Sequence, residues 1–175
     1  EIREFSVRII DVALIKKVLL YGLPLLAAGM AGTINETLDR TLYKHIVSDQ
    51  NVALFQLGIY GANYKLGSLV MIFVQMFRFA SEPFFFNYEK EHDAKEKYAK
   101  IMDVFVGVIL SLSLMIVLFI DYFKFFIDKS YYEGLVIVPW IALAYVFYGI
   151  FFNQSIWYKL SNKTHFAFVI TIVGA

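Results

Sequence analysis

Long apolar stretches separated by short polar joints dominate the pattern of hydrophobic and polar positions along the chain. Each complete stretch exceeds the roughly 20 residues that cross a 30 Å hydrocarbon core as a helix. None alternates strictly between apolar and polar positions, and in lipid only helices or closed barrels satisfy their backbone hydrogen bonds. The pattern therefore predicts an all-α integral membrane bundle, with four complete spans and the beginning of a fifth at about residues 18–42, 54–86, 101–126, 135–158 and 166–175.

The polar joints predict how the chain is oriented. Residues 88–100 carry the most charge and are predicted to form a solvated loop that runs into the next helix. Residues 46–51 and 128–134 resemble turns, 161–165 a tight hairpin, and 1–17 an amphipathic segment on the membrane surface. Ten Lys and Arg residues fall on the side of the N-terminal segment and four on the other. The positive-inside rule places the ten in the cytoplasm.

Composition supports the membrane class and narrows the chemistry. The chain is 59% hydrophobic and only 18% charged, whereas soluble domains average about 45–50% apolar and about 25% charged residues. A net charge of +1 gives no case for nucleic acid, and the lack of cysteine excludes disulfides and thiolate metal sites. We expect no cofactor and no metal. Because the chain begins without Met and ends inside an apolar run, we expect it to be a fragment of a larger membrane protein.

The second predicted span carries a polar stripe along one face of an otherwise apolar helix. At 100° per residue its members fall within about 40° of one line, and Arg78 and Glu82 stand at i and i+4, close enough to pair. Lys65 lies on the flank of the stripe. The stripe consists of Tyr64, Ser68, Met71, Gln75, Arg78 and Glu82.

The first predicted span repeats this arrangement with Gly32, Glu36, Asp39 and Tyr43 on one face and Arg40 at its margin. A charge at mid-bilayer costs about 2.5–3.5 kcal/mol. If the charges of both spans faced lipid, the cost would reach roughly 10 kcal/mol, comparable with the ~5–15 kcal/mol by which proteins are stable. We therefore expect the stripes to face other helices or a watery cavity.

Structural explanations stay open for each of these charges. Arg78 and Glu82 are also consistent with an ion pair that joins helices, and Arg78 with snorkelling to the cytoplasmic interface. Asp39 and Arg40 suit a purely interfacial role equally well. Lys65 lies closest to mid-membrane, where a structural role is hardest to justify. No phosphate-binding loop, nucleophilic triad or supported carboxylate pair is present, so nothing argues for an enzyme.

Several short motifs resemble those of a known family in their order and spacing. They are Gly-Leu-Pro at 22–24, Leu-Asp-Arg at 38–40, Leu-Gly-Ile-Tyr at 57–60, Glu-Pro-Phe at 82–84 and Trp-Tyr-Lys-Leu-X-X-Lys-Thr at 157–164. Together they resemble bacterial polysaccharide-biosynthesis proteins, the lipid-linked oligosaccharide (O-antigen type) flippases of the multidrug/oligosaccharidyl-lipid/polysaccharide exporter superfamily. The likeness covers nearly the whole chain, as the beginning of the family's C-terminal half.

The resemblance implies twelve to fourteen helices in two lobes around a cavity that opens to each side of the membrane in turn. It implies an undecaprenyl-diphosphate-linked oligosaccharide as substrate, carried from the cytoplasmic to the periplasmic leaflet of the bacterial inner membrane. H⁺ or Na⁺ is the implied coupling ion, and a polysaccharide polymerase is a possible partner besides the membrane lipids. Residues 1–175 would then be part of the C-terminal helical lobe.

The functional hypothesis places both stripes on that cavity. Arg40, Lys65 and Arg78 are expected to be counter-charges for the diphosphate or acidic sugars, because arginine binds phosphate bidentately and lysine acts as a point charge. Alternatives left open are an ion-coupled drug or cation antiporter of the same fold, a membrane glycan polymerase or acyltransferase, and a scaffold without transport. The remaining site residues are Tyr60, Asn63, Tyr64 and Gln75 for contacts in the cavity, and Glu36, Asp39 and Glu82 for charge balance or ion coupling.

Overall fold

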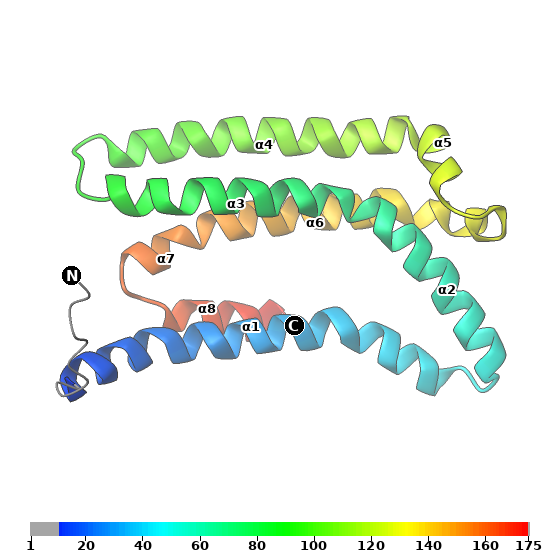
Figure 1. Ribbon diagram of the computed structural model, residues 1–175, viewed down its shortest axis with the longest axis horizontal. Coiled ribbons are helices and arrows are strands. Elements are labelled where there is room, and N and C mark those ends of the chain that lie inside the picture. Colours follow the sequence, from blue (N-terminus) through cyan, green and yellow to red (C-terminus); the bar gives the residue numbers. More distant parts are fainter. Residues whose placement is uncertain (1–10, 175) are drawn as a thin grey trace, which may run out of the picture. The chain divides into compact units, whose positions relative to one another are not determined.

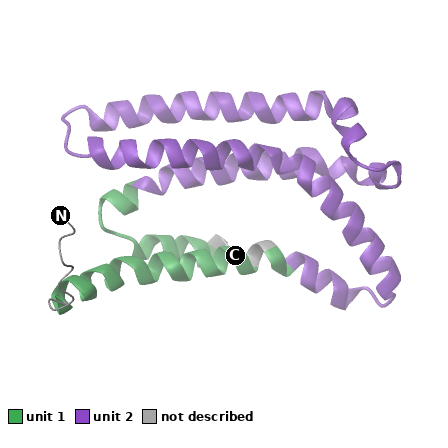
Figure 2. Ribbon diagram, in the orientation of Figure 1, with its two compact units in different colours: residues 1–38, 157–175 green, residues 39–156 purple. Residues whose placement is uncertain are grey.

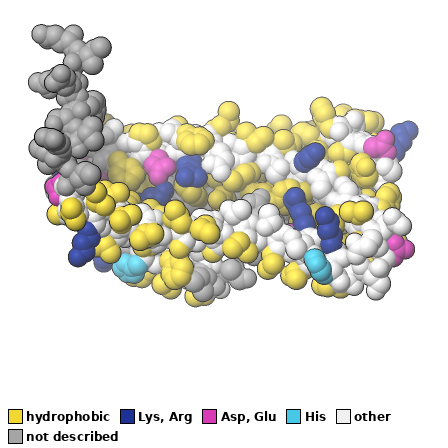
Figure 3. Space-filling model, turned by 60° about the horizontal axis from the view of Figure 1, so that its bottom comes forward, with side chains coloured by type: hydrophobic (Ala, Val, Ile, Leu, Met, Phe, Trp, Pro, Cys, Tyr) yellow, Lys and Arg dark blue, Asp and Glu magenta, His cyan; other side chains and the backbone are white. Residues whose placement is uncertain are grey.

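The protein is an all-α membrane protein with several spans, as its apolar pattern predicts. The computed structural model describes the backbone of residues 11–174 and the side chains of that range apart from residues 35, 36, 172 and 174. No strand occurs in this described part. Four segments are long and apolar enough to cross a membrane, namely Val12–Ile46, Leu69–Tyr88, Ala94–Leu118 and Lys129–Leu160. Large hydrophobic side chains remain exposed along them, and they cover much of the face drawn in Figure 3.

Helices follow one another with short connections (Figure 1). Two of the elements are 3₁₀ helices, in which each turn is tighter than in an α-helix. The order is α1 (Val12–Ile46), α2 (Gln50–Gly67), α3 (Leu69–Tyr88), α4 (Ala94–Leu118), α5 (Ile120–Phe123), η1 (Lys124–Phe126), η2 (Lys129–Ile137), α6 (Val138–Gln154), α7 (Ile156–Leu160) and α8 (His165–Gly174).

The chain forms two compact units, coloured in Figure 2. Unit 1 comprises residues 1–38 and 157–175, and unit 2 comprises residues 39–156. In unit 1 the predicted hairpin at 161–165 is present as a turn: the N–H of Lys163 donates to the carbonyl of Tyr158 at 2.8 Å. Asn162 adopts φ 55° there, a left-handed conformation that asparagine tolerates better than most residues and that commonly ends a helix.

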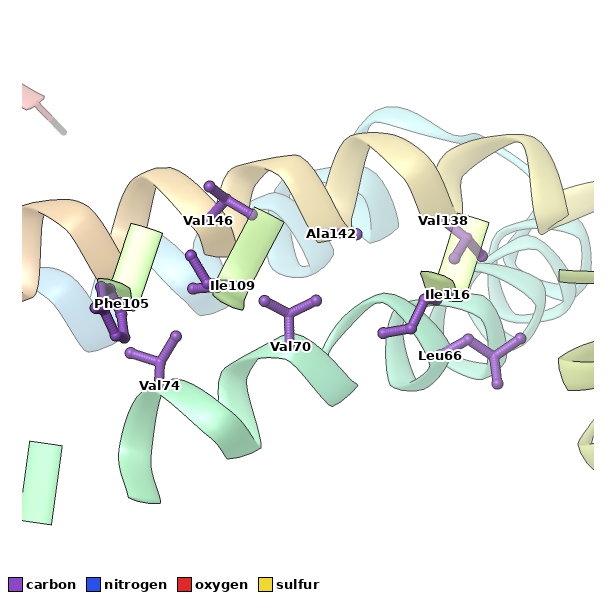
Figure 4. Close-up of a cluster of buried hydrophobic side chains, with 9 residues drawn as sticks. All are labelled: Leu66, Val70, Val74, Phe105, Ile109, Ile116, Val138, Ala142 and Val146. Carbon is purple, nitrogen blue, oxygen red and sulfur yellow. The ribbon is translucent and has the colours of Figure 1, made fainter. Parts of the chain in front are cut away.

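The core of unit 2 lies among α2, α3, α4 and α6. Figure 4 shows its buried aliphatic side chains and Phe105 pointing toward one another from these helices. Two glycines let α6 approach its neighbours closely. A Cβ added to Gly67 would lie 2.6 Å from Ile141 Cγ2, and one added to Gly149 would lie 2.8 Å from Ile109 Cδ1. Small residues serve helix packing in membranes in this way.

The second predicted span, 54–86, is two helices rather than one. It breaks between Gly67 and Leu69, and Figure 1 shows α2 running at an angle to α3. The hydroxyl of Ser68 donates to the carbonyl of Lys65 at 3.0 Å, and the Ser68 N–H donates to the carbonyl of Tyr64 at 2.9 Å. Serine hydroxyls that bond to the preceding turn bend helices, and Gly/Ser pairs are common at kinks.

Three other boundaries differ from the prediction. The charged segment 88–100 is helical from Ala94 onward, because Lys97–Asp93 and Lys100–Glu96 form i,i+4 ion pairs at 3.1 and 2.9 Å that favour helix. Residues 12–17, predicted as part of a surface segment, are the first turns of α1, while residues 1–10 lie outside the described part. The turn-like stretch 128–134 lies mostly in η2.

Candidate functional site

Asp39 and Arg40, near the C-terminal end of α1, lie against two tyrosines of α2. The guanidinium carbon of Arg40 lies 4.8 Å from the ring centroid of Tyr64 and 5.6 Å from that of Tyr60. The hydroxyl of Tyr60 donates to Asp39 Oδ2 at 2.9 Å. Because positions 60 and 64 are one helical turn apart, both rings face the same neighbour. These contacts join α1 to α2 through polar and aromatic groups.

The same group of residues extends to α6 through Tyr145. The hydroxyls of Tyr64 and Tyr145 are hydrogen-bonded, and their rings meet edge to face with centroids 6.0 Å apart. We call Asp39, Arg40, Tyr60, Tyr64 and Tyr145 the Arg40 cluster. All five belong to unit 2. Their contacts form a continuous polar path from α1 through α2 to α6.

Arg40 keeps hydrogen-bonding capacity within this cluster. Its side chain is half-buried, and its Nε is buried without a hydrogen-bond partner among the described residues. The two rings stabilise the cation through their faces, by about 0.5–1 kcal/mol each at sites that are still wet. Ring faces leave the N–H groups of a guanidinium unused, so an acceptor such as a phosphate or carboxylate oxygen can still be bound.

A cavity of about 560 Å³ adjoins the cluster. Ligand cavities typically measure roughly 300–1,000 Å³, so a ligand of several rings fits. Asp39, Arg40 and Tyr60 contribute the cluster's side of the lining, and Glu133 of η2 adds a second carboxylate. The lining thus combines two acids, a cation, the phenols of Tyr43 and Tyr60, the amide of Gln56 and apolar surface. This mixture suits a polyhydroxylated ligand, whose hydroxyls need both donors and acceptors.

Arg78 has a different environment. Its Nε lies 3.7 Å from Glu82 Oε2 on the same helix, and its guanidinium carbon lies 4.2 Å from the ring centroid of Phe152 on α6. It lines neither this cavity nor the second one described below. Gln75 uses its side chain locally, with Nε2 3.9 Å from Met71 Sδ.

Lys65 is separated from both arginines. Its side chain is exposed and lines a second cavity, of about 570 Å³, together with Asp128 and Tyr131. The Arg40 cavity does not include it. The three cations assigned to one cavity, Arg40 of the first predicted span and Lys65 and Arg78 of the second, therefore lie in three different surroundings.

Asn63 was predicted to contact the ligand, and the structure contradicts this. The residue is fully buried. Its Nδ2 donates to the carbonyls of Ile59 and Tyr131, each at 2.8 Å, which uses both of its N–H groups. A Cβ on Gly134 would lie only 2.4 Å from this nitrogen. Asn63 therefore fastens η2 to α2 through its amide nitrogen, while its Oδ1 is buried without a hydrogen-bond partner among the described residues.

Glu36, the other acid predicted on α1, is among the residues whose side chains lie outside the described part of the structure. Tyr145 and Glu133 are the site residues that sequence reasoning missed. A phenol in the apolar span 138–154 needs a hydrogen-bond partner, and this was the available signal for Tyr145. Glu133 lies within residues 128–134, which the sequence pattern predicted to be a turn, so no site was expected there.

Within the described residues no group of three or more His, Asp or Glu side chains is placed to hold a metal ion. In comparisons with known proteins, no family model, curated protein or solved structure matches this chain.

Proposed function

We propose that this chain contributes to a flippase that moves an undecaprenyl-diphosphate-linked oligosaccharide from the cytoplasmic to the periplasmic leaflet of the bacterial inner membrane. The observation that carries the proposal is the Arg40 cluster beside its cavity. There a half-buried guanidinium that lies over two tyrosine rings adjoins carboxylates, phenols and apolar surface. Such a lining can meet a phosphate and a sugar together.

Four members of the cluster have a role in this proposal. Arg40 supplies the fork of N–H donors that pairs with phosphate oxygens. Tyr60 offers a ring surface to a sugar in the cavity, Tyr64 supports Arg40 with its ring, and the Tyr60 hydroxyl keeps Asp39 in place at 2.9 Å. Asp39 balances the charge of Arg40 when the cavity is empty, and its carboxylate is the group we assign to an exchangeable H⁺ or Na⁺.

The family resemblance supports the same residues from a different direction. The Leu-Asp-Arg motif at 38–40 supplies Asp39 and Arg40, and the Leu-Gly-Ile-Tyr motif at 57–60 supplies Tyr60. The hydrogen bond from Tyr60 to Asp39 joins these two motifs across 21 positions of sequence. Alternating access, the undecaprenyl carrier and a polymerase partner enter the proposal through the resemblance alone.

Arg40→Gln tests the proposal in a strain that lacks the chromosomal gene. We expect lipid-linked oligosaccharide to accumulate on the cytoplasmic leaflet and its transfer to fall about tenfold or more, as loss of about 1.4 kcal/mol of binding would cause. Lys95→Gln, an exposed cation at the start of α4, is the matched control. Normal transfer by Arg40→Gln at wild-type protein levels would refute the proposed role of the cluster.

A drug or cation antiporter is the second candidate, because Asp39 and Glu133 place two carboxylates on one cavity. A cationic cargo would depend on those acids and be repelled by Arg40. Glu133→Gln then lowers cation efflux and Arg40→Gln raises it, whereas for a glycan substrate Arg40→Gln gives the larger loss. Measuring glycan transfer and dye efflux in the same two variants separates the two functions.

A further inference from the structure

The cavity that Lys65 lines is unconnected with the role proposed for the Arg40 cluster. It lies where α2 and α3 adjoin α5, η1 and the start of η2, so segments about 60 positions apart in sequence form its walls. Leu66 and Leu69 supply one wall and Phe123 and Phe126 another. Its volume of about 570 Å³ is large enough for a lipid head group and the first part of its chains.

This end of unit 2 exposes aromatic side chains. Tyr122, Phe125 and Phe126 are 70%, 75% and 82% exposed. Aromatic residues gather where a membrane protein crosses from hydrocarbon to head groups, although Trp and Tyr do so more strongly than Phe. The cavity therefore opens next to a surface suited to the lipid–water interface, and a bilayer lipid can reach it without crossing the protein.

The cavity holds two opposite charges that do not pair with each other. Lys65 contributes an ammonium and Asp128 a carboxylate to the lining. Across the described residues, no ion pair within 4.0 Å involves either of them. Opposite charges that share a cavity but stand apart suit a ligand that carries both charges itself.

The hydrogen bonds of Asp128 favour its ionised form and involve only one of its two carboxylate oxygens. Asp128 Oδ1 accepts both the N–H of Ser130, at 2.9 Å, and its hydroxyl, at 2.7 Å. These two hydrogen bonds hold the pKa of the Asp128 carboxyl below its ordinary value. No hydrogen bond to Oδ2 occurs among the described residues, so this oxygen can accept one from a ligand.

We propose that this cavity binds the head group of a phosphatidylethanolamine from the bilayer. The phosphate pairs with Lys65, the primary ammonium donates to Asp128 Oδ2, and an acyl chain follows Leu69 and Phe126. An anionic lipid without an ammonium would meet the charge of Asp128 uncompensated. A phosphatidylcholine head group has no N–H to donate. Charge therefore selects against the anionic lipid, and the hydrogen bond to Asp128 selects phosphatidylethanolamine over phosphatidylcholine.

The test uses the intact protein in lipid nanodiscs, with a tryptophan at the cavity as reporter. Phe126→Trp supplies it, after Trp140, Trp157 and any other tryptophan are replaced by phenylalanine. Its fluorescence is measured with dibrominated phosphatidylethanolamine, phosphatidylglycerol or phosphatidylcholine at equal mole fractions. We expect the ethanolamine lipid to quench at least about threefold more effectively than either of the others.

Two charge variants separate the contribution of Lys65 to lipid binding from that of Asp128. Lys129 is a neighbouring lysine outside the lining, and Lys129→Ala is the control. Lys65→Ala removes the partner of the phosphate, which all three lipids share, and should weaken quenching by each of them. Asp128→Asn keeps the Oδ1 acceptor for Ser130, so η2 stays capped, and should make phosphatidylglycerol quench as well as phosphatidylethanolamine. Melting temperatures within about 2 °C of the parent show that each variant is folded; a larger fall moves the measurement to Lys65→Gln or Asp128→Ser.

Three results would overturn the proposal. Equal quenching by all three lipids in the parent would mean that the groove is unselective. Stronger quenching by phosphatidylglycerol would assign it to an anionic lipid. Displacement of the brominated lipid by undecaprenyl phosphate at equimolar amounts would assign it to the carrier of the transported substrate.

Discussion

Arg40 and Arg78 are the same residue type on the same kind of apolar helix, yet their surroundings differ. Arg40 lies over two tyrosine rings that carry hydroxyls, beside a carboxylate bonded to one of them and at the edge of a cavity. Arg78 lies over the apolar ring of Phe152 and near the carboxylate of Glu82 one turn along its own helix. An arginine surrounded by groups that also suit a ligand can exchange them for one.

The different surroundings of the two arginines suit different roles, ligand binding for Arg40 and helix packing for Arg78. A guanidinium between an apolar ring and its own-helix carboxylate connects α3 to α6, and moving it to a ligand would break that contact. We therefore assign Arg40 to the substrate and Arg78 to helix association, and the following predictions compare the two regions.

The largest expected difference is in transport. Methionine in place of arginine keeps an unbranched chain and removes the charge and its donors. Arg40→Met should lower glycan transfer about 10- to 100-fold, corresponding to about 1.4–2.8 kcal/mol, whereas Arg78→Met should stay within about twofold of wild type. Transfer rates at matched protein levels measure this. Equal losses in both variants would remove the distinction between the two arginines.

Asn63, adjacent to Tyr64, sharpens the comparison within α2 itself. Asn63→Ala leaves the buried carbonyl of Tyr131 without its donor, and we expect a loss of about 1–3 kcal/mol in the free energy of unfolding. Protein that remains folded should transport normally per molecule. Thermal melting of purified protein, with exposed Asn51→Ala as the control, checks the first part. A transport defect larger than the loss of folded protein would return Asn63 to the binding site.

Tyr60→Phe examines the hydrogen bond that distinguishes the Arg40 cluster. The ring under Arg40 remains and only the donation to Asp39 is lost, so we expect about 0.5–1.5 kcal/mol, or roughly 2- to 10-fold, in transport. Tyr122→Phe, which removes an exposed hydroxyl from α5, is the control. If both substitutions behave alike, the Tyr60–Asp39 bond has no part in transport.

Periodicity predicted the helices and the polar faces, since both follow from 100° per residue within one segment. The apolar helices and the proximity of Arg78 to Glu82 are of this kind. Contacts between different segments do not follow from this periodicity. The Tyr60–Asp39 bond spans 21 positions and the Tyr64–Tyr145 bond spans 81, and both depend on how the helices pack.

The errors have the same physical origin. Lys65 and Arg78 were assigned to one cavity along a straight helix, but the bend at Ser68 and the packing of α6 give them different surroundings. Asn63 looked like a ligand contact because polar groups in apolar spans suggest function, whereas η2 supplied it with a buried carbonyl. A sequence reveals that a polar group needs a partner without revealing which partner it finds.

Glu82→Gln gives the smallest expected effect and tests the packing side of the comparison. The Arg78–Glu82 pair is separated by 3.7 Å, and its side chains are 34% and 29% exposed. An i,i+4 pair that solvent still reaches contributes only about 0.3–0.5 kcal/mol, and glutamine keeps the shape and a hydrogen-bonding end. We expect a shift in melting temperature close to the error of measurement and unchanged transport. A loss of transport comparable with that of Arg40→Met would instead identify Glu82 as an ion-coupling group, and Arg78 would then belong to the transport pathway.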